Sequence, residues 1–238
     1  MRDFRYNPAS VKLSIIVPAY NEAATITAML DRLLTVTFPI PMEVLVVDDG
    51  STDGTTDVLK RVSDPRLRVI IQPENRGKGA AIRAGIEKAT GELVIIQDAD
   101  LEYEPGDIPE LLKPIMSGEA EVVYGSRILR PNNPASYFRY YWGGRLVTLW
   151  TNILFGSSIT DEPTCYKLFK TDLLRELDLR CTGFEFCPEV TAKILRRKIP
   201  IHEIPIKYRP RGMAEGKKIR WWDGVIALWT LLKFRVCG

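Results

Sequence analysis

The first half of the chain alternates short apolar runs with segments of helical periodicity, and this pattern constrains the fold more than any other feature. Five runs rich in β-branched residues predict buried strands, at 13–18, 43–47, 67–71, 93–97 and 121–124. Four segments with helical spacing of apolar residues predict the connecting helices, at 22–34, 55–62, 77–89 and 108–116. This alternation predicts an α/β fold with a mostly parallel central sheet and helices on both faces.

The second half is less regular and contains two aromatic-rich segments, 137–155 and 219–236. We expect both to be C-terminal amphipathic helices that lie in a membrane interface or pack on the core or on a partner subunit. The longest uncharged stretch, 146–160, is too short and too polar to span a bilayer. The four cysteines form no C-x-x-C pair, which indicates reduced thiols. We therefore expect a cytoplasmic, peripheral protein.

Acidic residues follow three of the predicted strands, at Glu22, at Asp48 and Asp49, and at Asp98 and Asp100. In parallel sheets ligands bind beyond the carboxyl ends of the strands, so these clusters should converge. An i, i+2 carboxylate pair at a strand end can hold Mg²⁺ or Mn²⁺ between protein and a diphosphate. The sequence therefore predicts a divalent metal site there.

Several other kinds of site are disfavoured. The single histidine, His202, argues against histidine-based metal or triad chemistry. Residues 75–79 precede a predicted helix and suggest phosphate binding, but neither a P-loop nor a G-x-G-x-x-G follows a strand. The net charge is only +3, and the basic stretch 196–220 is weak support for nucleic-acid binding.

Five ordered motifs carry a family resemblance, at 17–22, 48–54, 75–79, 98–100 and 125–127. They resemble family 2 glycosyltransferases, and within that family the dolichol-phosphate mannosyltransferase branch. The resemblance implies a single GT-A (Rossmann-like) domain over 1–238. Its donor-binding part would be about 10–127 and its acceptor and membrane-facing part about 128–238.

The resemblance also implies roles for individual residues at the donor end. Those implied to contact the donor are Pro18, Tyr20, Glu22, Val47, Asp49, Asp98, Ala99 and Arg127. Asp98, Asp100 and Arg127 are the implied catalytic residues. The implied metal ligands are Asp98 and Asp100, with Glu102 in the position of a further ligand.

Basic residues downstream are candidates for the acceptor phosphate. Arg139 and Arg145 fall where the family places basic residues for this group, and Lys167 could add charge. Segment 161–170 resembles the family's D-x-x-x-[GS]-F-[KR] element but has Cys165 in place of the commoner glycine.

The family's R-x-x-G-x-S-K element is altered at 209–217. Arg209 fits its first half, whereas Arg211 has the right spacing from Lys217, so Arg211 and Lys217 are further donor candidates and the choice between the arginines stays open.

The function that these features imply is transfer of a hexose, with mannose from GDP-mannose as the best guess, to dolichyl or undecaprenyl phosphate by metal-assisted inverting displacement. A phosphate monoester is already anionic near neutral pH and needs cations rather than a general base. The expected partners are therefore a GDP- or UDP-sugar, a polyprenyl phosphate, the membrane surface and, as an alternative anchor, a partner subunit. The alternatives are transfer to a saccharide hydroxyl and a sugar-nucleotide-binding scaffold without turnover.

Overall fold

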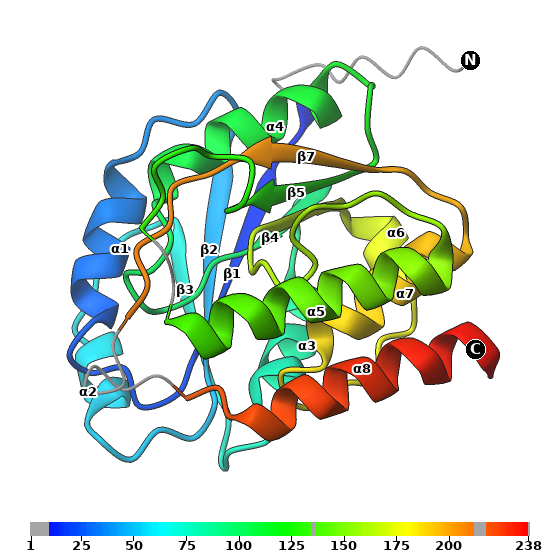
Figure 1. Ribbon diagram of the computed structural model, residues 1–238. Helices are drawn as coiled ribbons and strands as arrows, with labels where there is room; N and C mark the ends of the chain where they lie inside the picture. Colours follow the sequence, from blue (N-terminus) through cyan, green and yellow to red (C-terminus); the bar gives the residue numbers. More distant parts are fainter. Residues whose placement is uncertain (1–9, 135–136, 212–217, 238) are drawn as a thin grey trace.

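The computed structural model describes residues 10–134, 137–211 and 218–237 (Figure 1). Within them a single sheet has the strand order β3-β2-β1-β4-β6-β5-β7. The strands are β1 (Leu13–Ala19), β2 (Met42–Asp48), β3 (Leu67–Ile71), β4 (Leu93–Ile96), β5 (Val122–Ser126), β6 (Lys167–Lys170) and β7 (Ile201–Pro205). All five strands predicted from the sequence are present, with ends shifted by two residues at most.

The sheet is parallel except at β6, which runs antiparallel to both β4 and β5. On one side of β1, the pairing with β2 runs from Leu13 opposite Met42 to Ala19 opposite Asp48. On its other side, Ile16 pairs with Ile96 at the end of β4. The carboxyl ends of the three central strands therefore lie at one edge of the sheet, as the sequence predicted.

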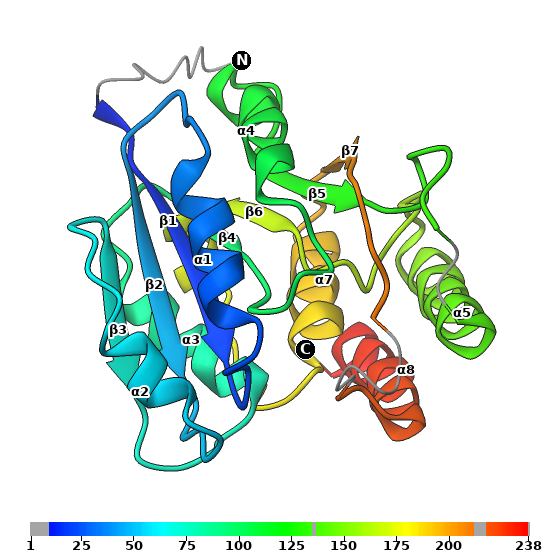
Figure 2. The same cartoon turned by 90° about the vertical axis from the view of Figure 1, so that its left-hand side faces the viewer.

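Helices flank both faces of the sheet (Figures 1 and 2). They are α1 (Ile26–Thr35), α2 (Thr55–Leu59), α3 (Lys78–Lys88), α4 (Ile108–Met116), α5 (Phe138–Phe155), α6 (Thr171–Glu176), α7 (Phe186–Arg196) and α8 (Trp221–Val236), with the short 3-10 helix η2 (Pro105–Asp107). Helices α5 and α8 lie side by side as an outer layer beyond α7. The α/β class with flanking helices is thus confirmed.

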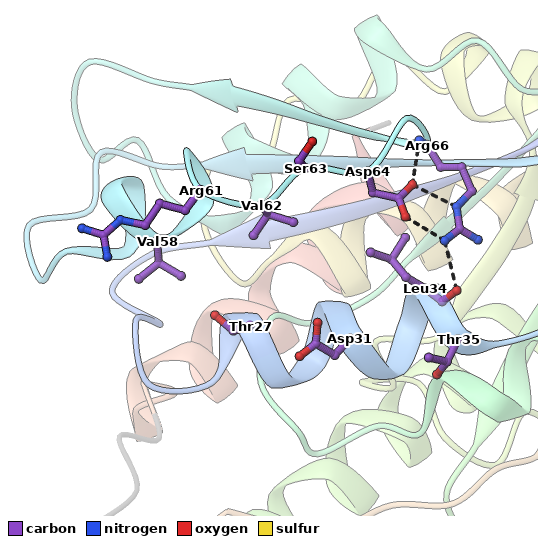
Figure 3. A pocket seen from close by; sticks show the side chains of 10 residues that line it. All are labelled: Thr27, Asp31, Leu34, Thr35, Val58, Arg61, Val62, Ser63, Asp64 and Arg66. Carbon is purple, nitrogen blue, oxygen red and sulfur yellow. Dashed lines mark hydrogen bonds and ion pairs between the residues drawn. The ribbon is translucent and has the colours of Figure 1, made fainter.

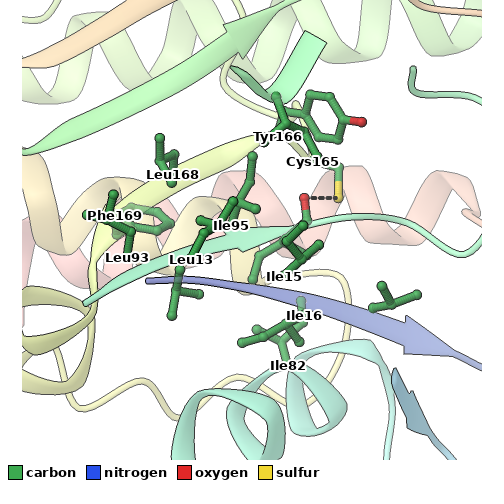
Figure 4. Close-up of a cluster of buried hydrophobic side chains, with 14 of the residues drawn as sticks. Leu13, Ile15, Ile16, Ile82, Leu93, Ile95, Cys165, Tyr166, Leu168 and Phe169 are labelled. Carbon is green, nitrogen blue, oxygen red and sulfur yellow. Dashed lines mark hydrogen bonds between the residues drawn. The ribbon is translucent and has the colours of Figure 1, made fainter. Parts of the chain in front are cut away.

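The main core lies where β1, β4 and β6 meet the helices (Figure 4). Ile15, Ile16 and Ile95 are completely buried there, because these strands are covered on both faces. The aromatic side chains of Tyr166 and Phe169 close the core on the β6 side. This packing fixes the strand ends that carry the polar loops.

The two aromatic segments are helices, but their outer faces are not polar. A small second core, built around Val147, Ala192 and Leu231, joins α5 to α7 and α8. The opposite face of α5 exposes large apolar side chains, including Phe138 at 77% and Ile153 at 64%. No helix within the described residues has both the length and the apolar content that crossing a bilayer requires.

Candidate active site at the carboxyl edge of the sheet

The loops after β1 and β2 are held together by their own polar side chains. The Asn21 amide donates a hydrogen bond to Ser51 Oγ (2.9 Å), and the Glu22 amide donates one to Thr55 Oγ1 (2.9 Å). The Asp49 amide donates to the Ala19 carbonyl (2.8 Å). These contacts bring the first two acidic clusters together, as predicted from the strand order.

Asp98 and Asp100 follow β4, and each is paired with a cation. Asp98 Oδ1 lies 2.5 Å from Lys78 Nζ, and Asp100 Oδ2 lies 2.7 Å from Arg211 Nη2. Burial raises the pKa of Asp98, but Lys78 outweighs it and the net pKa is lowered. Burial, then the charges of Asp98 and Glu102, raise the pKa of Asp100 to about 7. Negative charge is therefore crowded at the end of β4.

This pair of carboxylates fits a divalent cation. Hard cations bind oxygen ligands, and Mg²⁺ commonly uses one or two carboxylates together with substrate phosphates. The crowding that raises the pKa of Asp100 is what a bound cation would relieve. The described part of the chain contains no group of three or more histidine, cysteine or acidic residues arranged to hold a metal. A cation held by Asp98 and Asp100 would therefore take its other ligands from beyond these described groups, such as the oxygens of a bound diphosphate.

Glu22 is the second anionic point of the site. Its carboxylate accepts hydrogen bonds from Lys218 Nζ (2.7 Å) and Arg211 Nη1 (3.2 Å). Burial raises the pKa of Glu22, but hydrogen bonds from Lys218 and Thr25 lower it overall. Lys218 also donates to the Tyr20 and Asn21 carbonyl oxygens. Glu22 and Asp100 therefore share Arg211 between them.

Glu102, the predicted further metal ligand, contacts the segment that carries Arg211. Its carboxylate accepts hydrogen bonds from the Tyr208 hydroxyl (3.0 Å) and the Arg211 amide (2.7 Å). Its carbonyl accepts one from the Arg209 amide (2.8 Å), and Tyr103 forms a bridge with Tyr208. Glu102 thus fixes residues 208–211 beside the β4 loop and positions Arg211.

These contacts also separate the two candidate arginines. The Arg211 side chain reaches Glu22 and Asp100, whereas that of Arg209 is exposed. Of the two, Arg211 is therefore the arginine whose side chain contacts the predicted carboxylates. Its predicted companion Lys217 lies outside the described residues.

Asp49 and Val47 reach the site indirectly. Asp49 is buried, and its two carboxylate oxygens accept hydrogen bonds from the Arg76 amide (2.9 Å) and the Gly77 amide (2.7 Å). Burial raises the pKa of Asp49 despite these bonds. Asp49 therefore orders the loop that begins α3 and places Lys78. Val47 and Ala99, which were also predicted to contact the donor, are both buried.

Arg127, at the end of β5, is held by Asp161. Its Nε and Nη2 lie 2.8 and 2.7 Å from the two Asp161 oxygens, and its guanidinium lies 5.0 Å from the Tyr208 ring centroid. Burial opposes the charge of Arg127, but Asp161 raises its pKa well above the ordinary value. The arginine is thus fixed next to the segment that carries Arg211.

The acceptor candidates fall into two groups. Arg139 and Arg145 lie on α5, where Arg139 is exposed and Arg145 Nη1 donates to the Thr160 carbonyl (3.2 Å). Lys167 is completely buried on β6, with Nζ donating to the Glu162 carbonyl (2.5 Å) and lying 3.7 Å from the Tyr124 ring centroid. Lys167 is thus closed off from solvent, unlike Arg139, and its contacts are those of a core residue.

Three site residues were not assigned a role from the sequence: Lys78, Lys218 and Asp161. Lys78 lies in the segment 75–79, in which the sequence pattern points to the glycines as a phosphate-binding feature and not to the lysine. Lys218 follows directly after the predicted Lys217. Asp161 opens the 161–170 segment, but no sequence pattern indicates its pairing with Arg127.

A cavity lies away from these residues. It has a volume of about 810 Å³ and lies between α1 and α2, where Arg66 is hydrogen-bonded to Asp64 and to the Leu34 carbonyl (Figure 3). None of its lining residues is a predicted site residue. The cavity therefore does not mark the donor site.

Comparison with known sequences gives a consistent set of relatives. The profile of glycosyl transferase family 2 matches residues 14–178. The chain is 30% identical to the undecaprenyl-phosphate mannosyltransferase of Micrococcus luteus, covering 95% of this chain and 99% of that protein. It is 31% identical to a dolichyl-phosphate β-glucosyltransferase of Trichomonas vaginalis, covering 89% of this chain and 68% of that one.

A third relative is longer. The chain is 29% identical over 84% of its length to a low-salt glycan biosynthesis hexosyltransferase of Haloferax volcanii, and it spans about half of that protein (48%).

Solved structures show the same fold. Glucosyl-3-phosphoglycerate synthase from Mycobacterium tuberculosis, in complex with Mn²⁺, UDP and glucosyl-3-phosphoglycerate, superposes with a TM-score of 0.70 at 20% identity. The match covers 95% of this chain and 80% of that one. The architecture is therefore that of GT-A enzymes.

Proposed function

This chain belongs to glycosyl transferase family 2 and is a glycosyltransferase, and from that membership we propose that it transfers a hexose from a nucleotide-sugar to a polyprenyl phosphate. Two relatives named for undecaprenyl phosphate and dolichyl phosphate support this acceptor class. The single observation that carries the proposal is the Asp98–Asp100 pair at the end of β4, with Arg211 beside it.

At the donor end, Asp98 and Asp100 would hold a divalent cation, Mg²⁺ or Mn²⁺, together with the donor diphosphate. Such a cation neutralises the charge that develops on the leaving diphosphate. Arg211, which lies 2.7 Å from Asp100, is placed to contact the same phosphates. Tyr20 and Glu22, after β1, would face the nucleotide.

At the acceptor end, the lipid phosphate oxygen forms a bond to the anomeric carbon as the bond from that carbon to the diphosphate breaks, with inversion. No general base is required, because the phosphate is already anionic. Arg139 and Arg145 on α5 are the cations that we propose for it. The start of α5 lies beside the donor end, since Tyr140 Oη donates to the Ile219 carbonyl (3.5 Å), next to Lys218.

We further propose that the enzyme works peripherally at the cytoplasmic face of a membrane. The exposed apolar residues of α5 and α8 would meet the lipid surface on which a polyprenyl phosphate resides. A membrane-anchoring partner subunit covering the same helices is the alternative. On this proposal the whole chain forms one domain, with the donor part at about 10–127 and the acceptor part at about 128–238.

Two nucleotide-sugars are candidates for the donor. GDP-mannose is favoured by the resemblance and by the mannosyltransferase relative, whereas the glucosyltransferase relative and the UDP-bound neighbour favour UDP-glucose. Transfer to a saccharide hydroxyl is the second candidate function, favoured by the hexosyltransferase relative in glycan biosynthesis.

The test is release of nucleoside diphosphate from GDP- and UDP-sugars with Mg²⁺ or Mn²⁺, with and without a short polyprenyl phosphate. We expect release that needs both metal and lipid phosphate and that falls by about 100-fold or more in Asp100→Asn. Asp172→Asn, a carboxylate exposed on α6, is the matched control and should retain full activity. Lipid-independent transfer to saccharides would overturn the acceptor assignment.

A further inference from the structure

In the structure, each of the two carboxylates that we propose as metal ligands forms an ion pair with a basic side chain of the protein. Lys78 Nζ lies 2.5 Å from Asp98 Oδ1, and Arg211 Nη2 lies 2.7 Å from Asp100 Oδ2. Each proposed metal ligand thus already has a positive partner inside the protein. A divalent cation that binds these oxygens must compete with Lys78 and Arg211.

The fold itself places both cations. Lys78 is the first residue of α3, and the Gly77 amide before it is held by Asp49. The Arg211 amide is fixed by Glu102 at 2.7 Å. Both side chains are largely shielded from solvent, where a charge is costly unless it is paired. These ion pairs are therefore built into the site rather than incidental surface contacts.

Among the described residues, the carboxylates joined by these ion pairs and hydrogen bonds are Glu22, Asp98, Asp100 and Glu102, and the cations are Lys78, Arg211 and Lys218. A divalent cation that binds alone displaces Lys78 and Arg211 from the two aspartates without bringing an anion for either of them, although Arg211 keeps its contact with Glu22. A diphosphate brings phosphate oxygens that can pair with a displaced lysine or arginine. The metal and the diphosphate should therefore enter together.

We propose that Lys78 and Arg211 are internal counter-cations of the metal-binding carboxylates, which make divalent-cation binding depend on a nucleoside diphosphate. Both move from carboxylate to phosphate when metal and nucleotide bind. In this role they are positioning residues that couple the binding of the metal to the binding of the diphosphate. The inference rests on the proposed function for its donor and metal, but not for its acceptor.

The experiment measures Mn²⁺ binding to the full chain from the EPR signal of free Mn²⁺, with and without GDP or UDP. In the wild type we expect the nucleotide to tighten Mn²⁺ binding by about tenfold or more. Arg211→Gln should tighten binding of Mn²⁺ alone by about tenfold and reduce the nucleotide effect. Lys78→Met should also tighten binding of Mn²⁺ alone and reduce the nucleotide effect. It provides the test if Arg211→Gln does not fold.

Arg209→Gln is the matched control, since it removes the same charge from an exposed neighbour that does not touch Asp100. Its effect on Mn²⁺ binding should be less than about twofold, because exposed charges are screened. Equal Mn²⁺ affinities in Arg211→Gln and Arg209→Gln would overturn the proposal. The proposal would also be overturned if the wild type bound Mn²⁺ equally well with and without GDP or UDP, or if it bound no Mn²⁺ even in the presence of the nucleotide.

Failure of the proposed acceptor gives a different result. The enzyme could show nucleotide-dependent Mn²⁺ binding that becomes less dependent on nucleotide in Arg211→Gln, and yet not use a polyprenyl phosphate. That result would refute the proposed acceptor and support the counter-cation role of Lys78 and Arg211.

Discussion

At the scale of single residues, three carboxylates after β4 stand close together in sequence but do different things. Asp98 and Asp100 face the cations Lys78 and Arg211. Glu102 instead accepts hydrogen bonds from the Tyr208 hydroxyl and the Arg211 amide. Residue type and spacing predict one shared metal role, and the different partners of Glu102 lead us to propose a separate, positioning role for it.

Glu102→Gln tests this separation. The amide oxygen of glutamine can still accept the hydrogen bond from the Arg211 amide, so we expect activity to fall less than about fivefold. The Mn²⁺ concentration that gives half-maximal rate should stay nearly constant. Glu102→Ala removes both bonds and should raise the donor KM by about tenfold, since Arg211 is no longer held. Steady-state kinetics with varied donor and Mn²⁺ distinguishes the two variants.

A large rise in the Mn²⁺ requirement of Glu102→Gln would restore Glu102 to the metal ligands. Tyr208→Phe is the control for the other contact of this carboxylate, and it should have a smaller effect than Glu102→Ala because the Arg211 amide bond remains.

Lys167 provides a second prediction at this scale, because its charge is in the core. Lys167→Met removes the hydrogen bond to the Glu162 carbonyl and the contact with the Tyr124 ring. We expect a loss of about 2 kcal/mol in the free energy of unfolding, measured by urea denaturation, with an unchanged acceptor KM. Arg145→Gln on α5 should do the opposite, raising the acceptor KM by about tenfold with little change in stability. An acceptor KM that rises in Lys167→Met would contradict the structural role.

The sequence was informative about residues whose neighbours follow from strand order. Glu22, Asp98 and Asp100 were placed correctly because parallel strands end at one edge. Lys218 was missed because its partner Glu22 is 196 residues away and no periodicity links them. No periodicity links Arg127 with Asp161 either. Their pairing depends on where the antiparallel strand β6 lies in the sheet.

At the scale of elements, the sequence predicted the first half and the two aromatic helices α5 and α8 well, but it predicted neither β6 nor β7. Strands β1, β2 and β4 are nearly pure apolar runs, because helices cover both their faces. Strand β6 has only four residues and begins and ends with lysine, and β7 at the sheet edge includes His202 and Glu203. Neither has a clear strand pattern, because Lys167 is buried against a carbonyl and β7 is only half-buried.

Glu43 shows how one side chain joins elements of the well-predicted half. Its carboxylate accepts hydrogen bonds from Ser14 Oγ on β1 (2.6 Å), from the Thr90 amide before β4 (2.7 Å) and from Lys12 Nζ (3.0 Å). Burial raises the pKa of Glu43, but these bonds outweigh it and lower the pKa to about 2. The carboxylate form is therefore a cross-link between β1, β2 and β4.

The sign of the pH effect follows from this lowered pKa. Because the folded pKa is below the ordinary value of 4.5, the stabilisation is fully present above that pH and is lost as the pH falls toward about 2. We expect Glu43→Gln to lower the free energy of unfolding by about 2 kcal/mol at pH 7, a value discounted for partial solvent screening. Urea denaturation at pH 7, 5 and 3 should show the difference from wild type shrinking only below about 4.5. A difference that is constant with pH would contradict the cross-link.

At the scale of the whole molecule, the donor edge and the outer helix layer are adjacent. Lys218 binds Glu22 at the donor edge, and α8 begins three residues later at Trp221. Trp221 and Trp229 on α8 are 65% and 64% exposed, and Trp142 on α5 is 56% exposed. On the proposed function, an apolar surface of this kind beside the donor edge would hold the enzyme at the membrane that contains its polyprenyl phosphate acceptor.

Replacing Trp221, Trp222 and Trp229 by serine should weaken binding to vesicles that contain anionic lipid by about tenfold or more, because the rings of tryptophan favour the membrane interface. Donor binding should be unchanged, since none of these indole rings contacts Glu22, Asp98 or Asp100. Co-sedimentation with vesicles and titration with GDP or UDP measure the two properties. Ile71→Ser is the matched control, because Ile71 is 49% exposed on edge strand β3, at the opposite side of the sheet from β7.

The two explanations for the exposed aromatics predict different results in the same assay. If lipid covers α5 and α8, the purified wild-type chain binds vesicles by itself and the serine variant does not, while Ile71→Ser binds as the wild type does. If a partner subunit covers them, the wild-type chain alone sediments no better than the serine variant. That outcome would refute direct membrane binding, because nothing but the chain and the lipid is present. Turnover of a water-dispersed short polyprenyl phosphate should survive the serine substitutions in either case, since Arg139 and Arg145, the cations proposed for the acceptor, are retained.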